Sequence, residues 1–318
     1  MKRTTNLRPT FRAAAVGVLS AAVAASALAG CSNPSLSPAT PNSSSTAAEI
    51  PAAQKDDKLA ALVPERLRSA SKVKVATSAP FAPYEMFAGP GSTELIGLEI
   101  DLGHAIGETL GVPFEFSQQP YDGIIPGVQA GKYDVVMATL FDTPEREEQL
   151  DFVNYARSGS GIMIKQTGSE IKTLDDLCGR AAGVQNGSTQ ADLLEEQSKK
   201  CAAAAKSPID IKAFPSQSDQ QLALNSGSII AIVGDLPALS YSAAQDKAFT
   251  VIEDPAAQGG YESNLIGVGV LKTDEGFAEA VAGAIQKLMD NGIYKSILDK
   301  YSVSQTAIPE PIVNQHGG

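Results

Sequence analysis

The sequence predicts an α/β protein with two lobes, in which the second lobe is inserted into the first and a ligand cleft lies between them. Short apolar strands alternate with helical segments along most of the 318 residues, an order that gives parallel or mixed sheets covered by helices. A chain of this length allows two domains of ~100–200 residues each. Two apolar segments, at residues 162–165 and 265–271, are expected to cross between the lobes and to permit hinge closure.

The first lobe is predicted from segments on both sides of the insertion. Residues 59–71 form a charged, helical lead-in, and the alternation at residues 73–77 predicts the first strand. The elements expected next are a proline-stiffened loop at 78–84, a helix at 101–110 ended by Gly111, a strand at 113–116, a short helix within 121–128 and a strand at 135–138. Helices at 276–289 and 293–301 are expected to return to this lobe, before a mobile, proline-rich tail from residue 302.

The second lobe is predicted as a smaller unit of the same kind. A short helix at 174–177 precedes strands at 180–184, 209–211, 229–233 and 249–252, with helices at 190–204 and 216–225 and a further helix opening at 234–237. The expected divisions of the chain are a signal peptide at 1–30, a lipidated cysteine and linker at 31–58, lobe 1 at 59–162, lobe 2 at 163–262, and the return of lobe 1 with the tail at 263–318.

The N-terminal residues have the pattern of an export signal. Basic residues precede a stretch of small apolar side chains at 13–29, which ends in Leu28-Ala29-Gly30-Cys31. This ending looks like the lipobox of bacterial lipoproteins, in which Cys31 becomes the lipidated first residue. An uncleaved membrane anchor is the alternative, but the apolar run is short and alanine-rich for a spanning helix. The Ser-, Pro- and Thr-rich residues 32–58 predict a flexible tether at the outer face of a membrane.

Charge and cysteine content limit the partners. The net charge is −11 and no basic run occurs outside the first residues, which argues against a nucleic-acid partner. Once Cys31 carries lipid, Cys178 and Cys201 remain; in an exported protein this even remainder predicts one disulfide, with two free buried thiols as the alternative. Neither His104 nor His316 is near these cysteines in the sequence, so no metal site and no cofactor are expected.

Residues 131–155 contain the strongest indication of a binding site. The apolar strand at 135–138 leads to Asp142 or Thr143 as helix N-cap and Pro144 as first helical residue, which places Arg146 in the first turn. A helix start offers free N–H groups and partial positive charge, and the arginine adds a planar fork of donors. This combination suits a small carboxylate at the end of a strand. The alternative is that Arg146 pairs with a neighbouring acid on a solvated face.

Several motifs occur together in a characteristic order. They are A-P-F-x-P-Y-E at 79–85, G-L-E-I-D-L at 97–102, Y-D-G-I-I-P at 121–126, G-K-Y-D-V-V-M-A with T-P-E-R at 131–146, V-Q-N-G-S-T-Q at 184–190 and D-N-G-x-Y at 290–294. Behind a lipobox, this series resembles the family 3 extracellular solute-binding proteins, the amino-acid receptors of bacterial ABC importers, over residues 72–303. The resemblance implies a type II periplasmic-binding-protein-like fold, a small amino-acid ligand and an ABC permease as partner. The spacing of Cys178 and Cys201 resembles that of actinobacterial members and implies a lipoprotein of a Gram-positive cell.

The resemblance also implies roles for the residues that meet the two ends of an amino acid. Arg146 matches the arginine that clamps the ligand α-carboxylate, and Thr139 matches a position that hydrogen-bonds the backbone end of the ligand. Thr189, with Ser188, matches the second-lobe loop that meets the carboxylate on closure. Asp235 matches the second-lobe carboxylate that receives the α-ammonium group. From the residues alone, Thr189 and Asp235 are equally well explained as helix caps.

The walls of the site are expected to be aromatic. Phe81 and Tyr121 match the rings that sandwich the ligand side chain, with Tyr84 nearby, although all three are also explained as core residues. Two positions depart from the family pattern. Ser78 stands where members that take glutamine or basic amino acids often carry an acid, and Phe141 stands where a hydroxyl often faces the ligand ammonium. These departures leave fewer polar groups for the ligand and make a modified amino acid or an opine-like compound an alternative.

Two other functions were weighed. A cleft enzyme on the same fold, similar to cyclohexadienyl dehydratase, needs a positioned acid or base, and only Glu85 and Glu262 are loose candidates. A sensor or lytic-enzyme accessory is expected to carry an additional domain, which the segments above do not provide. We therefore expect a monomeric, non-enzymatic, lipid-anchored receptor that captures an amino-acid-like zwitterion and delivers it to a permease.

Overall fold

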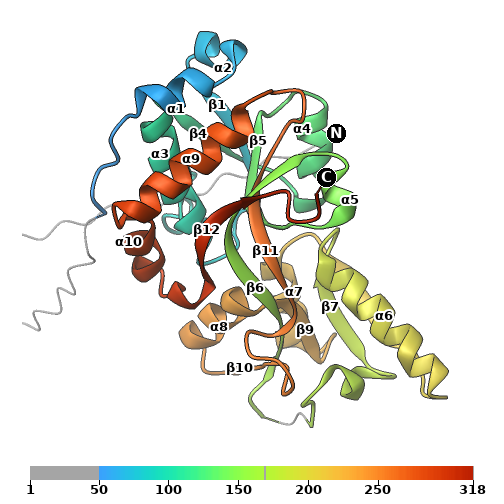
Figure 1. Ribbon diagram of the computed structural model, residues 1–318. Coiled ribbons are helices and arrows are strands. Elements are labelled where there is room, and N and C mark those ends of the chain that lie inside the picture. Colours follow the sequence, from blue (N-terminus) through green and yellow to red (C-terminus); the bar gives the residue numbers. More distant parts are fainter. Residues whose placement is uncertain (1–49, 168–169, 318) are drawn as a thin grey trace, which may run out of the picture. The chain divides into compact units, whose positions relative to one another are not determined.

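The computed structural model describes residues 50–167 and 170–317 and shows a two-lobed α/β architecture (Figure 1). The predicted signal peptide, Cys31 and most of the predicted linker lie outside the described residues. Within the described ranges, no helix is both long and apolar enough to cross a membrane.

A single large sheet runs through both lobes. Its strands are β1 (Val73–Thr77), β4 (Phe114–Gln118), β5 (Val135–Phe141), β6 (Asp151–Lys165), β7 (Ala181–Gln185), β8 (Asp210–Phe214), β9 (Ala231–Asp235), β10 (Phe249–Ile252), β11 (Tyr261–Val270) and β12 (Ala307–Val313). The strand order is β4-β1-β5-β11-β6-β9-β7-β8, and β10 and β12 both pair with β6. A separate small sheet contains β2 (Met86–Phe87) and β3 (Leu95–Ile96).

Helices cover the sheet in both lobes. Those of lobe 1 are α1 (Asp57–Leu62), α2 (Glu65–Ala70), α3 (Leu98–Leu110), α4 (Ile124–Gln129), α5 (Pro144–Glu147), α9 (Phe277–Asp290) and α10 (Ile293–Lys300), with the 3₁₀ turns η1 (Tyr121–Gly123) and η3 (Ser304–Thr306). Those of lobe 2 are η2 (Leu174–Leu177), α6 (Thr189–Ala203), α7 (Gln217–Ser226) and α8 (Leu236–Gln245). The apolar positions of α9 recur every three to four residues and are buried, which explains why this helix packs in the core beside α3 and α10.

Two long strands carry the chain between the lobes. Antiparallel β6 and β11 lie side by side, and Figure 1 shows them running from one lobe into the other. The first part of β6 pairs with β11 and β12, whereas its end, from Ile162 to Lys165, pairs with β9 and β10. Sequence reasoning identified only this end, because Phe152, Val153, Tyr155 and Ala156 are all buried and give no alternation.

The prediction of a mobile tail from residue 302 was wrong. Residues 307–313 form β12, which pairs antiparallel with β6. The register shifts between Ala307 and Ile312, and Pro309 and Pro311 fall in this irregular stretch. Since proline cannot donate to a ladder hydrogen bond, the irregularity is what allows a proline-rich segment to join the sheet.

The predicted disulfide is confirmed. Cys178 and Cys201 are bonded, with their Cα atoms 5.6 Å apart. The bridge ties the turn before β7 to the last part of α6, both in lobe 2. For a separation of 23 residues, the chain-entropy model assigns such a cross-link a stabilisation of about 3 kcal/mol.

Candidate functional site

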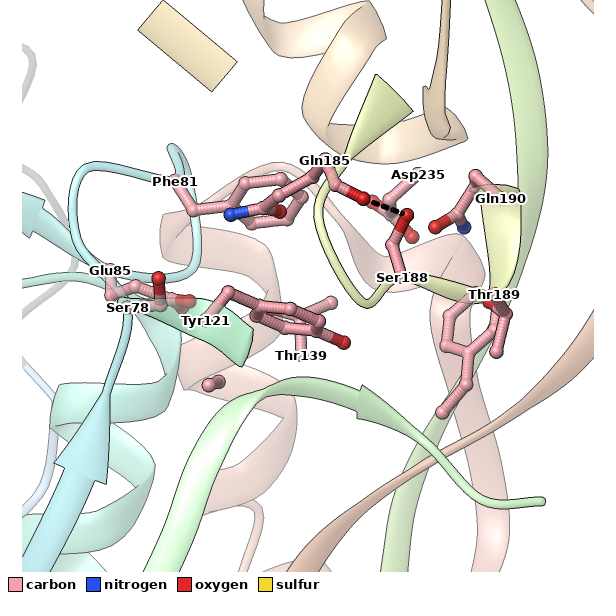
Figure 2. Close-up of a pocket in the computed structure, with 12 residues that line it drawn as sticks. Ser78, Phe81, Glu85, Tyr121, Thr139, Gln185, Ser188, Thr189, Gln190 and Asp235 are labelled. Atoms are coloured by element: carbon pink, nitrogen blue, oxygen red, sulfur yellow. Dashed lines mark hydrogen bonds between the residues drawn. The ribbon is translucent and has the colours of Figure 1, made fainter. Parts of the chain in front are cut away.

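A small cavity lies at the edge where strands of the two lobes end (Figure 2). Its free volume is about 20 Å³, roughly what one water molecule needs. It is lined by Ser78, Phe81, Glu85, Tyr121, Ala138, Thr139, Phe141, Gln185, Ser188, Thr189, Gln190 and Asp235. Of the residues predicted to bind ligand, seven therefore meet here: Phe81, Tyr121, Thr139, Phe141, Ser188, Thr189 and Asp235.

The topology explains why these positions converge. Ser78 directly follows β1, Phe141 ends β5, Gln185 ends β7 and Asp235 ends β9. These four strands belong to one sheet, and the carboxyl ends of strands in open α/β sheets are where ligands bind. Thr189 contributes from the first turn of α6, where backbone N–H groups are free.

Arg146 lies beside this cavity and links the two lobes. Its Nη1 donates to the Phe141 carbonyl at 2.8 Å, and its Nη2 donates to the Gly187 carbonyl of lobe 2 at 3.1 Å. The guanidinium lines an adjoining open cavity of about 590 Å³, which shares Phe141 and Thr189 with the first. Its hydrogen bonds go to backbone carbonyls, so Arg146 is not simply one half of a surface ion pair.

Asp235 both caps a helix and faces the cavity. Its Oδ1 accepts from the Ala238 N–H at 3.0 Å, as expected of the N-cap of α8, and its Oδ2 accepts from the Ser158 hydroxyl of β6. Burial raises the pKa of Asp235 to about 6, although the hydrogen bonds from Ser158 and Ala238 oppose the shift. Because burial disfavours the ionised form of Asp235, a cation bound beside it would stabilise that form.

Two further carboxyl groups are buried at or behind the cavity wall: Glu85 lines the cavity, and Glu99 is hydrogen-bonded to the lining residue Thr139. Glu85 and Glu99 are fully buried, and Glu99 Oε1 accepts from the Thr139 N–H at 2.8 Å and from the Tyr155 hydroxyl. Within the described part of the chain, Glu85 Oε1, Glu85 Oε2 and Glu99 Oε2 have no hydrogen-bond partner. Burial, and then the charge of Glu99, raises the pKa of Glu85 well above its usual range. Because buried acids without donors are costly, the cavity beside Glu85 is suited to a positively charged group.

Thr139 is held in an unfavourable backbone conformation. Its φ is +50°, in the left-handed region that β-branched residues avoid. Such a conformation costs of order 1–3 kcal/mol and occurs most often at functional sites. The hydrogen bond from its N–H to Glu99 helps to hold it, and its buried Oγ1 has no partner in the described structure.

The aromatic residues divide into lining and support. In Figure 2 the Phe81 ring is drawn above the Tyr121 ring at the cavity, with Ser188 and Asp235 to the right of them. Tyr84 lines neither cavity; it is fully buried and stacks against Phe81 with ring centroids 6.1 Å apart. Tyr84 therefore supports Phe81.

Three polar residues of the lining were not predicted as ligand contacts, although Glu85 was named as a candidate acid or base of a cleft enzyme. Glu85 ends the A-P-F-x-P-Y-E motif, and Gln185 and Gln190 lie within V-Q-N-G-S-T-Q. The only available signal was their position inside these motifs at strand and helix ends. The expectation of few polar groups, drawn from Ser78 and Phe141, is therefore corrected: Glu85 supplies an acid from a position seven residues after Ser78.

Comparisons with known proteins show which family the chain is similar to. The family model of the bacterial extracellular solute-binding proteins, family 3, matches residues 73–304. An arginine-binding protein of Corynebacterium glutamicum is 27% identical over 261 residues, covering 80% of this chain and 82% of that protein. The L-arginine-binding protein of Pseudomonas aeruginosa is 28% identical over 235 residues, 72% and 87% of the two chains. The solved structure of an ancestral arginine-binding protein bound to arginine is 31% identical, with a TM-score of 0.65 over 73% of this chain and 98% of that one.

The substitution Glu85→Gln should flatten the pH dependence of stability in ligand-free protein. A carboxyl group whose pKa is raised in the folded state keeps its proton at pH values at which the same group in the unfolded chain has already lost it. Its stabilisation is therefore complete below the unfolded value of 4.5 and declines as the pH rises. Urea unfolding between pH 4.5 and 8 should show a slope shallower by up to ~1.4 kcal/mol per pH unit. The exposed Glu94→Gln should keep the wild-type slope, and an unchanged slope in Glu85→Gln would contradict the argument.

Proposed function

Because the chain belongs to the bacterial extracellular solute-binding proteins of family 3, we propose that it serves an ABC importer as the receptor for an amino acid with a cationic side chain, such as L-arginine. The observation that carries this choice of ligand is the buried Glu85 carboxyl at the cavity, neither oxygen of which has a hydrogen-bond partner within the described residues. The matched relatives are named as amino-acid-binding proteins of transporters, which supports binding and not the dehydratase alternative.

The proposed ligand position follows the charges of the two cavities. Arg146 and the N-terminus of α6, with Ser188 and Thr189, take the α-carboxylate. Asp235 takes the α-ammonium group, with Thr139 on the opposite lobe. The side chain then passes between the rings of Phe81 and Tyr121, beside Phe141. Its terminal cation is placed toward Glu85, where stacking and cation–π attraction add to the charge pairing.

Capture requires the lobes to separate. The inner cavity, at about 20 Å³, does not admit an amino acid, so entry breaks the Arg146–Gly187 hydrogen bond between the lobes. We assign residues 59–162 with 263–318 to one moving body and residues 163–262 to the other, hinged at β6 and β11. The ligand favours the closed state because its two ends contact different lobes only there.

The cellular setting is proposed from the N-terminal sequence. Residues 1–30 direct export, Cys31 is lipidated, and the part of the predicted linker before residue 50 tethers a monomeric receptor to the outer face of the cell membrane beside its permease, because Ile50, Ala53 and Asp56 already contact lobe 1. The basic n-region, the small-residue stretch and the Leu-Ala-Gly-Cys ending support this assignment. The relative from Corynebacterium glutamicum supports a Gram-positive, actinobacterial origin.

Calorimetry with L-arginine and with L-citrulline, its uncharged analogue, tests the ligand class. We expect arginine to bind more tightly than citrulline, because only arginine offers a cation to Glu85. In Glu85→Gln this preference should largely disappear, whereas Glu94→Gln should retain it. Equal affinities of the wild-type protein for the two ligands would refute the role of Glu85 while leaving amino-acid binding intact.

Removal of the proposed carboxylate clamp should abolish most of the affinity. Arg146→Ala should weaken arginine binding at least ~30-fold, corresponding to the ~2 kcal/mol or more lost when one partner of a buried charge pair is truncated. The exposed Arg180 of lobe 2 provides the matched control, and Arg180→Ala should bind normally. Wild-type affinity in Arg146→Ala, or no binding of any amino acid by the wild-type protein, would overturn the proposal.

Affinity for arginine should fall as the solution is acidified below pH ~6, because the pKa of Asp235 in the free protein is about 6 and the ammonium group requires the ionised form. Each group that must lose a proton contributes up to a tenfold change per pH unit. Dissociation constants measured from pH 5 to 8 should therefore show a steeper pH dependence in the wild-type protein than in Asp235→Asn. Equal slopes would exclude Asp235 as the titrating contact.

Lipidation of Cys31 is tested by fractionation and by labelling with a fatty-acid analogue. Cys31→Ser should remove the label and release the protein from the membrane fraction, whereas the neighbouring Ser32→Ala should remain labelled and bound. Continued membrane association of unlabelled Cys31→Ser would favour an uncleaved membrane anchor.

A further inference from the structure

Three side chains of metal-binding type meet outside the ligand cavities. Asp142 follows β5, Glu147 ends α5, and His316 lies after β12, yet one ligating atom from each falls within 4.8 Å of the others. Asp142 is fully buried and Glu147 is 1% exposed, whereas His316 is exposed. None of the three lines the cavities described above.

The Asp142 carboxylate carries a second, independent indication of a missing partner. Its Oδ2 accepts from Asn154 Nδ2 at 2.7 Å and from the Gln315 N–H at 3.4 Å. Its Oδ1 is equally buried and has no hydrogen-bond partner among the described residues. Two adjacent buried carboxyl groups are unfavourable together unless a cation or a shared proton compensates them.

The segment that follows β12 holds the imidazole at this pair. The His316 N–H donates to Glu147 Oε1 at 2.9 Å, and the ring Nε2 lies 3.3 Å from the Asp142 carbonyl oxygen. Gln315 Nε2 donates to the same carbonyl at 3.0 Å and to Asn264 Oδ1 at 2.6 Å. The backbone of this segment is thus held by its own hydrogen bonds, while the His316 side chain is exposed to solvent.

We propose that Asp142, Glu147 and His316 bind a divalent transition-metal ion, Zn²⁺ foremost, that fastens the segment after β12 to the turn bearing Arg146. One imidazole and two carboxylates are a ligand set for Zn²⁺, with water at the remaining position, whereas Ca²⁺ and Mg²⁺ prefer oxygen ligands alone. Tetrahedral Zn²⁺ with bonds of ~2.0–2.2 Å separates its ligand atoms by roughly 3.5 Å. The ligating atoms lie within 4.8 Å of one another, so binding requires a small approach, which rotation of the exposed His316 imidazole toward the Asp142 carboxylate would provide.

The test uses Zn²⁺ alone, added to chelator-treated protein that carries Cys31→Ser so that a free thiol does not compete. We expect one equivalent to bind and to raise the thermal midpoint. His316→Ala should weaken binding at least ~10-fold, the scale at which even outer-shell partners of a metal act. The control is His104→Ala, which removes the only other histidine of the chain. His104 lies on α3 and packs against Phe116, and its replacement should leave Zn²⁺ binding unchanged. Glu147→Gln provides a second variant if His316→Ala alters the fold, and it should also weaken binding.

Imidazole NMR gives an independent readout, because the chain contains two histidines. Zn²⁺ should shift the His316 ring nitrogens and leave those of His104 in place. Absence of binding at 100 μM Zn²⁺, a shift confined to His104, or unchanged binding in both His316→Ala and Glu147→Gln would overturn the proposal.

Discussion

The buried carboxylate of Glu99 connects the ligand cavity to the core of lobe 1. It comes from α3 and accepts from the N–H of Thr139 on β5 and from the hydroxyl of Tyr155 on β6. The backbone of Tyr155 in turn accepts from the Tyr294 hydroxyl at 2.7 Å, and that hydroxyl accepts from the Ile308 N–H of β12 at 3.2 Å. A continuous hydrogen-bonded path therefore runs from the cavity to the strand that completes the sheet. Since Glu99 also lies beside Glu85, the same carboxylate that orders the backbone sets the charge of the cavity.

Charge is distributed unevenly along the two cavities. Glu85 and Asp235 line the inner cavity, with Glu99 behind its wall at Thr139, whereas Arg146 and the start of α6 line the outer one. A ligand with one carboxylate and two cationic groups matches this distribution better than a neutral amino acid does. The repulsion among these acids is evident at Glu85, where burial and the charges of Glu99 and Asp235 all raise the pKa. Such a site gives up some stability of the free protein in exchange for ligand preference.

Features that depend on neighbouring residues in the sequence could be predicted, whereas features that depend on distant contacts could not. The strand before Pro144 and the Thr143 cap are local features, so the position of Arg146 could be predicted. The first part of β6 could not, because burial on both faces removes the alternating pattern. β12 was not predicted because its prolines argue against a strand. Only the pairing with β6 shows that these prolines fall where the register of the ladder shifts. Tyr84 and Phe81 lie three residues apart, and no local pattern distinguishes the lining residue from its support. Glu85 was named only as a loose candidate for an acid or base, because the burial that makes it a candidate ligand contact is visible only in the structure.

The pairing of β12 with β6 also determines the order in which the two lobes can fold. Residues 170–252 supply η2 and the strands β7–β10 with their helices, so most of lobe 2 can assemble as soon as they have emerged. The lobe 1 side of β6 waits instead for β11 and then for β12, after the inserted lobe has passed. Contacts so distant in sequence form late. A chain that has emerged only as far as residue 252 therefore lacks β11 and β12, so its ligand cavity cannot form before the last part of the chain is available.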